Sequence, residues 1–186
     1  SRLYVHGSLG PNRGVVMLVI YDPGHIDHNP VTELYDGAPT PTPETPDRIE
    51  SIRNVLLQRN DIEWRSPDHF DDSVALGLHT NRYNSYLPRM CAQLNQGEQS
   101  VPSNFIHDTY APIVAGTWQA ARSALDTALT AAKALWSGER SAYALCRPPG
   151  HHAGDAYMGG YCFFNNAAAA ANYLSASGSV AVLDID

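Results

Sequence analysis

Two clusters in this sequence combine residue types and spacings that could do chemistry. The first is the histidine pair His151-His152, which lies between Pro-Pro-Gly and Ala-Gly in the stretch CRPPGHHAG. The second is the pair Asp184 and Asp186 in VLDID, two acids separated by one residue. A histidine can act as a base near neutral pH, and a carboxylate on its far ring nitrogen fixes its tautomer and raises its basicity.

Together these residue types would suit metal-assisted amide hydrolysis. A zinc ion would polarise a substrate carbonyl and acidify a bound water, while a histidine takes a proton and later gives one to the leaving amine. One acid could bind the metal and the other could orient a histidine. Plainer interpretations remain open, because paired histidines occur in polar loops and D-x-D also serves as a capping arrangement. No serine elbow, P-loop or G-x-G-x-x-G motif in the sequence competes.

The elements that must position these clusters form a predicted open α/β sheet. Short apolar or β-branched runs predict strands at 15–21, 141–146 and 179–186. The order strand, helix, strand, helix, strand implies parallel pairing with crossover helices. In such sheets the ligand crevice lies beyond the carboxyl ends of the strands, where both clusters fall. Because alternate residues of a strand share a face, Asp184 and Asp186 should project into the same space.

Helices are predicted from apolar residues that recur at steps of three and four. The clearest runs from Thr117 to Trp136, and an alanine-rich helix is expected within 165–178. Thr45 followed by Pro46 predicts a helix start. Another helix is expected after Asp72, with the following residues at helical spacing: Leu76, His79, Tyr83 and Tyr86.

Composition limits the class of partner. The formal net charge of −7 comes without a Lys/Arg cluster, so we expect neither nucleic acid nor an anionic membrane as partner. Three cysteines without C-x-x-C spacing argue against a disulfide framework and favour a cytoplasmic setting. The early apolar run at 15–21 is too short to span a bilayer. Residues 1–14 are interpreted as an N-terminal extension or an expression remnant.

The motifs RPPGHHAG, GGYCFFNNAA and VLDID, in this order, strongly resemble the histone deacetylase and acetylpolyamine amidohydrolase superfamily. The resemblance extends to HNPVTELYDG and LHTNRYNSYL and is greatest to the acetylpolyamine branch. It implies an arginase-like α/β fold with catalytic zinc. Residues 15–186 would be the N-terminal part of one catalytic domain, with the fold continuing beyond 186.

The resemblance also implies roles for individual residues. His151 looks like an electrostatic histidine supported by Asp184, and His152 looks like the general base and acid. Asp186 looks like a zinc ligand, and Asp184 matches a structural monovalent-cation site, usually potassium. Two further zinc ligands and an oxyanion-stabilising tyrosine are expected after the D-x-D, so the sequence holds one of three protein zinc ligands.

Four positions bear on the substrate. By resemblance, Gly160 and Tyr161 line the acyl-amine tunnel, where many protein deacetylases carry Phe instead of this tyrosine. Asn81 looks like the position where many protein deacetylases place a rim aspartate that grips the substrate backbone, and the asparagine here weakens the case for a protein substrate. Glu33 is either a solvated loop acid or the group that attracts a cationic polyamine.

Among other candidates, His25 and His28 lie in the Pro/Gly-rich stretch 22–46, which favours a place at the pocket mouth over metal binding. Cys162 is interpreted as a packed residue and not as a nucleophile, because no group is arranged to activate it.

The expected function is a zinc-dependent amidohydrolase that deacetylates small acetylated amines such as acetylpolyamines. The alternatives are a protein acyl-lysine deacetylase, or a non-catalytic fragment or relative that acts as a binding module. Relatives of the polyamine type often form dimers near the pocket mouth, so a homodimer through 22–46 is expected by analogy.

Overall fold

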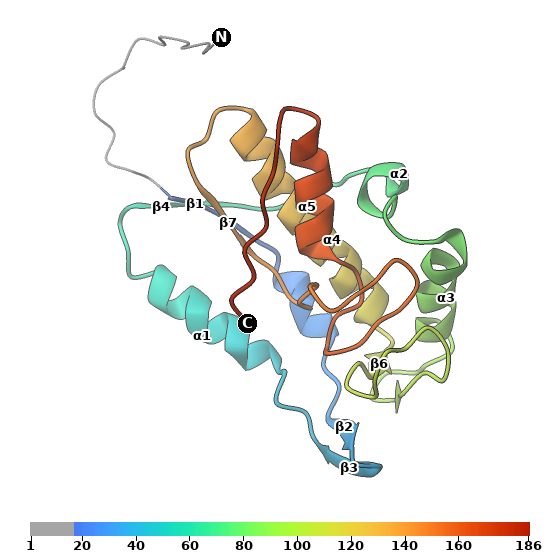
Figure 1. Cartoon of the computed structure of the whole chain (residues 1–186). Coiled ribbons are helices and arrows are strands. Elements are labelled where there is room, and N and C mark those ends of the chain that lie inside the picture. The colour runs from blue at the N-terminus through green and yellow to red at the C-terminus, as the bar shows by residue number, and fades with distance from the viewer. Residues whose placement is uncertain (1–16) are drawn as a thin grey trace, which may run out of the picture.

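A parallel three-stranded sheet lies at the centre of the computed structural model, which describes residues 17–186 (Figure 1). The strand order is β4-β1-β7, formed by β1 (Met17–Tyr21), β4 (Ile62–Arg65) and β7 (Ala142–Leu145). Val19 pairs with Trp64 on one side and with Tyr143 on the other. The predicted α/β class with a parallel sheet flanked by helices is confirmed. The predicted extension at 1–14 and the start of the strand at 15–21 lie outside the described residues.

The central strand β1 is apolar at every inner position because both faces of the sheet are covered. Leu18, Val19 and Ile20 are all buried, although successive side chains point to opposite faces. Strand β4, absent from the sequence prediction, alternates half-buried and exposed residues at the sheet edge. Its mixed composition explains why the apolar pattern missed it.

The long helix α4 (Thr117–Trp136) supports the sheet, as predicted. It packs on β1, β7 and the alanine-rich helix α5 (Asn166–Ser175), and it buries Leu125 and Leu129. Helix α1 (Pro46–Leu56) begins after Thr45 with proline in its first turn, again as predicted. No helix of the described residues combines the length and hydropathy needed to cross a membrane.

The single helix expected after Asp72 is wrong, because the chain forms two. Helix α2 (Asp72–Ala75) stops before Gly77, and helix α3 (Asn81–Cys91) starts after Thr80. A Cβ at Gly77 would lie 2.4 Å from the carbonyl oxygen of Ser73, so the backbone there packs too closely for a side chain. The break turns the chain so that the backbone N–H of Thr80 donates to the carbonyl of Asp155 at 2.8 Å.

The Pro/Gly-rich stretch 22–46 is an ordered excursion from the end of β1. It contains a short 3-10 helix η1 (Pro23–Asp27) and an antiparallel hairpin of β2 (Thr32–Tyr35) and β3 (Ala38–Pro41). The hairpin turns at Asp36-Gly37, where both residues have positive φ, a conformation that Asp-Gly favours. A second small antiparallel pair joins β5 (Gln99–Ser100) to β6 (Ile113–Val114).

The strand predicted at 179–186 is wrong for this structure. These residues form no strand, and the side chains of Leu183 and Ile185 are 87% and 90% exposed. A strand needs a neighbouring strand to receive its backbone hydrogen bonds, and within the described residues β7 pairs only with β1. The segment leads back from α5 and ends beside the histidine pair.

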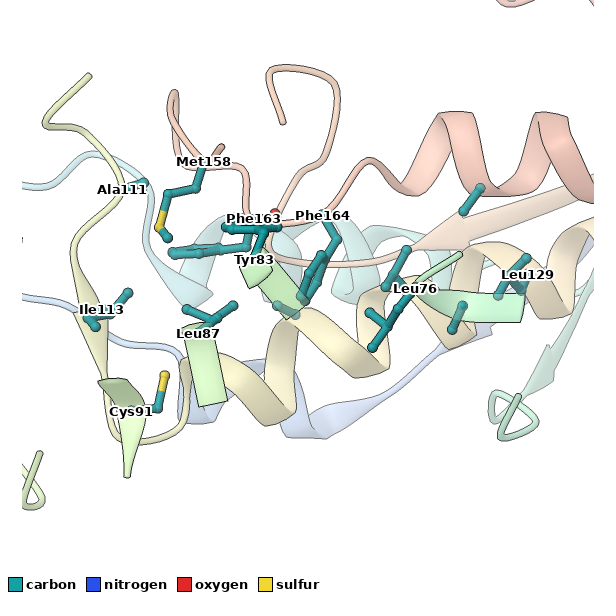
Figure 2. Packing of buried hydrophobic residues seen from close by; sticks show 14 residues of the cluster. Leu76, Tyr83, Leu87, Cys91, Ala111, Ile113, Leu129, Met158, Phe163 and Phe164 are labelled. Carbon is teal, nitrogen blue, oxygen red and sulfur yellow. Dashed lines mark hydrogen bonds between the residues drawn. The ribbon is translucent and has the colours of Figure 1, made fainter. Parts of the chain in front are cut away.

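An aromatic core fixes the loops around the carboxyl ends of the strands (Figure 2). Tyr83 of α3 packs against Phe164 at 5.7 Å between ring centroids, and its hydroxyl donates to the carbonyl of Phe163. His79 and Trp118 also contact the Phe164 ring edge to face, at 5.0 Å and 5.8 Å. These contacts anchor the stretch 153–164, which immediately follows the histidine pair.

Candidate active site

The histidine pair lies on a tight loop at the carboxyl end of β7, where the sequence placed it. A Cβ at Gly150 would lie 2.5 Å from the backbone nitrogen of Asn166, so only glycine allows this approach to the start of α5. The side chain of Asn166 also donates to the carbonyl of Pro148 at 3.1 Å. The loop is therefore held to α5 directly before the two histidines.

His151 lies between the two acids. Its Nδ1 is 2.8 Å from Asp184 Oδ2, and its Nε2 is 3.2 Å from Asp186 Oδ2. The backbone N–H of Asp186 and the His151 ring together lower the pKa of the Asp184 carboxyl, so it stays ionised as a hydrogen-bond acceptor. The predicted pairing of His151 with Asp184 is present, although a coil and not a strand supplies the acids.

His152 lies against its neighbour, with ring centroids 4.1 Å apart, and its side chain is exposed. Both histidines line a cavity of about 360 Å³ together with Gly160, Tyr161 and Asp186. The structure thus brings together five of the predicted site residues at one end of the sheet, and Asp184 touches this group through His151.

One wall of the cavity is a tight turn from Gly159 to Cys162. Two backbone hydrogen bonds close it, and its central residues Gly160 and Tyr161 have φ of 51° and 66°. A Cβ at Gly160 would lie 2.4 Å from Cδ2 of His152. Glycine at this position therefore lets the turn pack directly on the ring of His152.

Glu33 lies on β2, and its interpretation as a solvated loop acid is wrong. It is only 6% exposed, and its Oε1 accepts a hydrogen bond from the Tyr161 hydroxyl at 3.3 Å. Its second oxygen, Oε2, is buried and has no hydrogen-bond partner in the described part of the chain. Burial and the nearby Glu33 raise the pKa of Tyr161 to about 12, so this tyrosine remains a donor at neutral pH.

Asn81 is not brought to the cavity. It lies exposed in the first turn of α3, and it is not among the residues that line the space beside His151. The motif LHTNRYNSYL instead contributes two buried side chains to the hydrophobic core, Tyr83 and Leu87. These two residues are four positions apart and so lie on the same, inward face of the helix.

Sequence reasoning missed a buried network around Arg147, which is 1% exposed. Its Nε lies 2.8 Å and 2.9 Å from the two carboxylate oxygens of Glu44. Its other nitrogens donate to the backbone carbonyls of His25, His28 and Glu44. Arg147 thus ties the excursion 22–46 to the loop that carries the histidine pair. Its position directly before that motif is the one sequence feature that could have indicated this role.

His25 and His28 are buried and do not line the cavity beside His151, so the expected place at the pocket mouth is wrong. His28 Nδ1 is 2.9 Å from the Thr117 hydroxyl. Burial and the Arg147 guanidinium lower the pKa of His28 to about 3, which keeps this imidazole neutral. The two histidines are therefore buried structural residues that help to hold the excursion 22–46 in place.

Cys162 is buried, and burial raises the pKa of its thiol to about 11. It donates to the carbonyl of Gly160 at 3.3 Å. A protonated, packed thiol supports its interpretation as a structural residue. Cys91, Cys146 and Cys162 are all free.

Three side chains gather donor atoms that a divalent metal could use. His151, His152 and Asp186 each offer one such atom, and these atoms lie within 4.8 Å of one another. Nitrogen and carboxylate donors suit zinc. Both ring nitrogens of His151 already face carboxylates, which is the geometry of an oriented histidine. Of these three residues, Asp186 is therefore the best candidate for a metal ligand. The described residues do not supply the four ligands of a tetrahedral zinc site around it.

Comparison with known proteins matches residues 42–186 to the histone deacetylase domain model. Acetylpolyamine amidohydrolase 1 of Pseudomonas aeruginosa is 38% identical over 91% of this chain and 57% of its own length. The acetylpolyamine amidohydrolase of Mycoplana ramosa is 33% identical over the same shares of the two chains. The chain thus spans a little over half the length of these curated relatives.

The fold comparison agrees. A crystal structure of acetylpolyamine aminohydrolase from Burkholderia pseudomallei superposes with a TM-score of 0.78 at 30% identity, covering 86% of this chain and 53% of that one. Sequence and fold together show that the chain belongs to the histone deacetylase domain family.

Proposed function

We propose that this chain forms part of a zinc-dependent amidohydrolase that removes acetyl groups from small acetylated amines. The observation that carries the proposal is the juxtaposition of the His151–Asp184 pair, His152 and Asp186 at one cavity. Family membership supports a deacetylase, and the similar curated relatives named acetylpolyamine amidohydrolases support the small substrate.

The two histidines would handle protons and charge in different ways. Asp184 accepts from Nδ1 of His151, which would hold that ring in one tautomer and favour its cationic form as negative charge develops on the substrate. His152 has no such carboxylate within the described residues, and its exposed ring would take a proton from water and return it to the leaving amine.

Asp186 would hold the zinc, together with ligands from other parts of the protein. A bound zinc would polarise the amide carbonyl and acidify a water. The remaining chemistry rests on the chain's own groups: the wall at Gly160 keeps His152 in place, and the turn presents the hydroxyl of Tyr161. The side chain of Asp184 is further proposed to contribute to a structural potassium site, by family resemblance.

Glu33 supports a cationic amine as the substrate. Its buried carboxylate has one oxygen without a hydrogen-bond partner, and an ammonium group is a donor that would satisfy it. Glu33 does not itself line the cavity beside the histidines, but its carboxylate contacts the hydroxyl of Tyr161, which does, so a linear acetylated diamine would extend past Tyr161 with its free amine toward Glu33.

Two alternatives compete with this proposal. A protein acyl-lysine deacetylase would use the same histidines on a larger substrate, and a binding module would hold a ligand without turnover. The buried acid that contacts Tyr161 of the wall favours the small cationic substrate over the protein deacetylase. The aligned His151–Asp184 pair favours catalysis over the second.

A homodimer is proposed as the assembly. The excursion 22–46 carries three exposed apolar side chains, Ile26, Val31 and Tyr35, which are 58%, 72% and 54% exposed. Such residues would be covered if two copies met at this face.

The proposal is tested on the full-length protein that contains this chain. Initial rates are measured with an acetylated diamine and with an acetyl-lysine peptide, before and after metal removal by a chelator and after zinc is restored. We expect a higher kcat/KM for the diamine, loss of activity without metal and recovery with zinc. A higher kcat/KM for the peptide would favour the protein deacetylase, and zinc binding without turnover would favour the binding module.

A further inference from the structure

The turn from Gly159 to Cys162, which forms one wall of the cavity, is hydrogen-bonded to Asp108 of a distant loop. Asp108 lies between β5 and β6, and its Oδ2 accepts the backbone N–H of Gly160 at 2.8 Å. Its other oxygen, Oδ1, accepts the backbone N–H of Tyr110 at 2.8 Å. One carboxylate therefore joins two loops that are about fifty residues apart in the sequence, and among residues 17–186 both of its bonds come from backbone N–H groups.

The turn needs such support because its conformation is unfavourable. Both central residues lie in the left-handed region, which glycine adopts freely but a bulky side chain such as that of Tyr161 rarely does. Strained backbone persists where the surrounding structure fixes it, and it is often found at functional sites. The two hydrogen bonds between Gly159 and Cys162 close the turn but do not fix its position against the rest of the fold.

Asp108 stands at the end of a short ladder that aligns the two loops. The backbone N–H of Met158 donates to Phe105 at 2.8 Å, and that of His107 donates to Met158 at 2.7 Å. The bond from Gly160 to Asp108 comes next along this register. A Cβ at Gly159 would lie 3.0 Å from Asp108 Oδ2, so the carboxylate is packed closely against the turn.

The position of the turn controls two groups of the site at once. Gly160 packs on the ring of His152, and the Tyr161 hydroxyl reaches Glu33. Asp108 itself does not line the cavity beside the histidines, so it acts only through the turn.

We propose that Asp108 is a positioning residue that holds the Gly160-Tyr161 turn against His152 and Glu33. Its effect on turnover rests on the proposed function, whereas its effect on the turn does not. A carboxylate suits the role because it offers an acceptor to each N–H, and hydrogen bonds to an ionised acceptor are stronger than neutral ones. An asparagine offers only one acceptor oxygen.

The first test is hydrogen–deuterium exchange of the full-length protein, read by mass spectrometry on peptides that cover 158–163. Asp108→Asn should speed exchange there by about tenfold, since it removes one charge-assisted bond. Asp155→Asn is the matched control, because it removes the same charge from an exposed residue of the neighbouring loop. It should leave exchange at 158–163 unchanged.

A second variant and a kinetic readout separate positioning from general stability. Asp108→Glu keeps the charge but displaces the carboxylate, and it should show a smaller local increase. Asp108→Asn should also raise KM for an acetylated diamine more than KM for a neutral acetamide of equal length, because only the amine would meet Glu33. Unchanged exchange at 158–163 in both variants, or faster exchange across the whole chain, would overturn the proposal.

The two readouts distinguish this inference from the proposed function. Local loss of protection without any amide hydrolysis by the parent protein would uphold the positioning role and reject the deacetylase. Hydrolysis by the parent protein with unaltered protection in the Asp108 variants would support the deacetylase and reject the positioning role of Asp108.

Discussion

Replacement of Arg147 by methionine should be among the most damaging single changes in this protein. The substitution keeps an apolar stem of similar length but removes the guanidinium, which contacts Glu44 and three backbone carbonyls in a buried place. The carboxylate of Glu44, which is itself buried, would then have lost its charged partner.

The size of the effect follows from burial. Removing one partner of a buried ion pair costs about 3–5 kcal/mol, because an uncompensated charge is left behind. Domains of this size are stable by only about 5–15 kcal/mol, so Arg147→Met should remove a large part of the free energy of unfolding. Adding Glu44→Gln removes the orphaned charge and should recover roughly 2 kcal/mol of that loss.

Urea unfolding followed by tryptophan fluorescence measures these differences. With a slope of about 2 kcal/mol per molar urea, the single variant should lower the midpoint by about 2 M, and the double variant by less. Arg59→Met is the matched control, because Arg59 pairs with Asp61 at the exposed surface and its loss should barely move the midpoint. A midpoint for Arg147→Met within about 0.5 M of the parent would show that the buried Arg147–Glu44 pair contributes little to stability.

Three further predictions concern pH, substrate and orientation. The pKa of His28 is lowered from its ordinary 6.5 to about 3, so between these values the unfolded chain binds a proton that the folded chain excludes. The free energy of unfolding should therefore fall by up to about 1.4 kcal/mol for each pH unit below 6.5. Urea titrations of His28→Gln should show a weaker pH dependence than those of His69→Gln, which changes a histidine whose side chain is 79% exposed and serves as the control. Glu33→Gln should raise KM for an acetylated diamine about tenfold or more, and equal increases for a neutral amide in the same steady-state assay would contradict the role of Glu33. Asp184→Asn should lower kcat by about 10- to 100-fold by freeing the His151 ring, and a kcat within twofold of the parent would show that the pair does not orient this histidine.

The fold could be predicted where local pattern and burial agree. Helix α4 repeats apolar residues at helical spacing along its whole length, and β1 is a continuous apolar run because it lies at the centre of the sheet. Strand β4 was missed because an edge strand shows no such run. The helix after Asp72 was predicted too long, because close backbone packing at Gly77 overrides the helical spacing on either side.

For the candidate site too, residue types could be predicted from the sequence, whereas contacts between distant segments could not. The histidine pair and the two acids could be proposed as one group from their residue types, and the structure places Asp184 and Asp186 beside His151. The strand predicted for the acids depended on a partner strand, which no local pattern reveals. Arg147 and Asp108 bond to backbone carbonyls and N–H groups of distant segments, and no residue pattern identifies the partners of such bonds.

The measurement that tests the central claim most directly is kcat for an acetylated diamine with His152→Asn in the full-length, zinc-loaded protein. Because His152 is proposed to transfer the proton, kcat should fall by about 10²- to 10⁴-fold while zinc content and KM change little. Asp155→Asn, an exposed change in the same loop, should keep the parent rate. A kcat for His152→Asn close to that of the parent would rule out His152 as the proton-transfer group, because the cavity beside this histidine would then not be where the amide is cleaved.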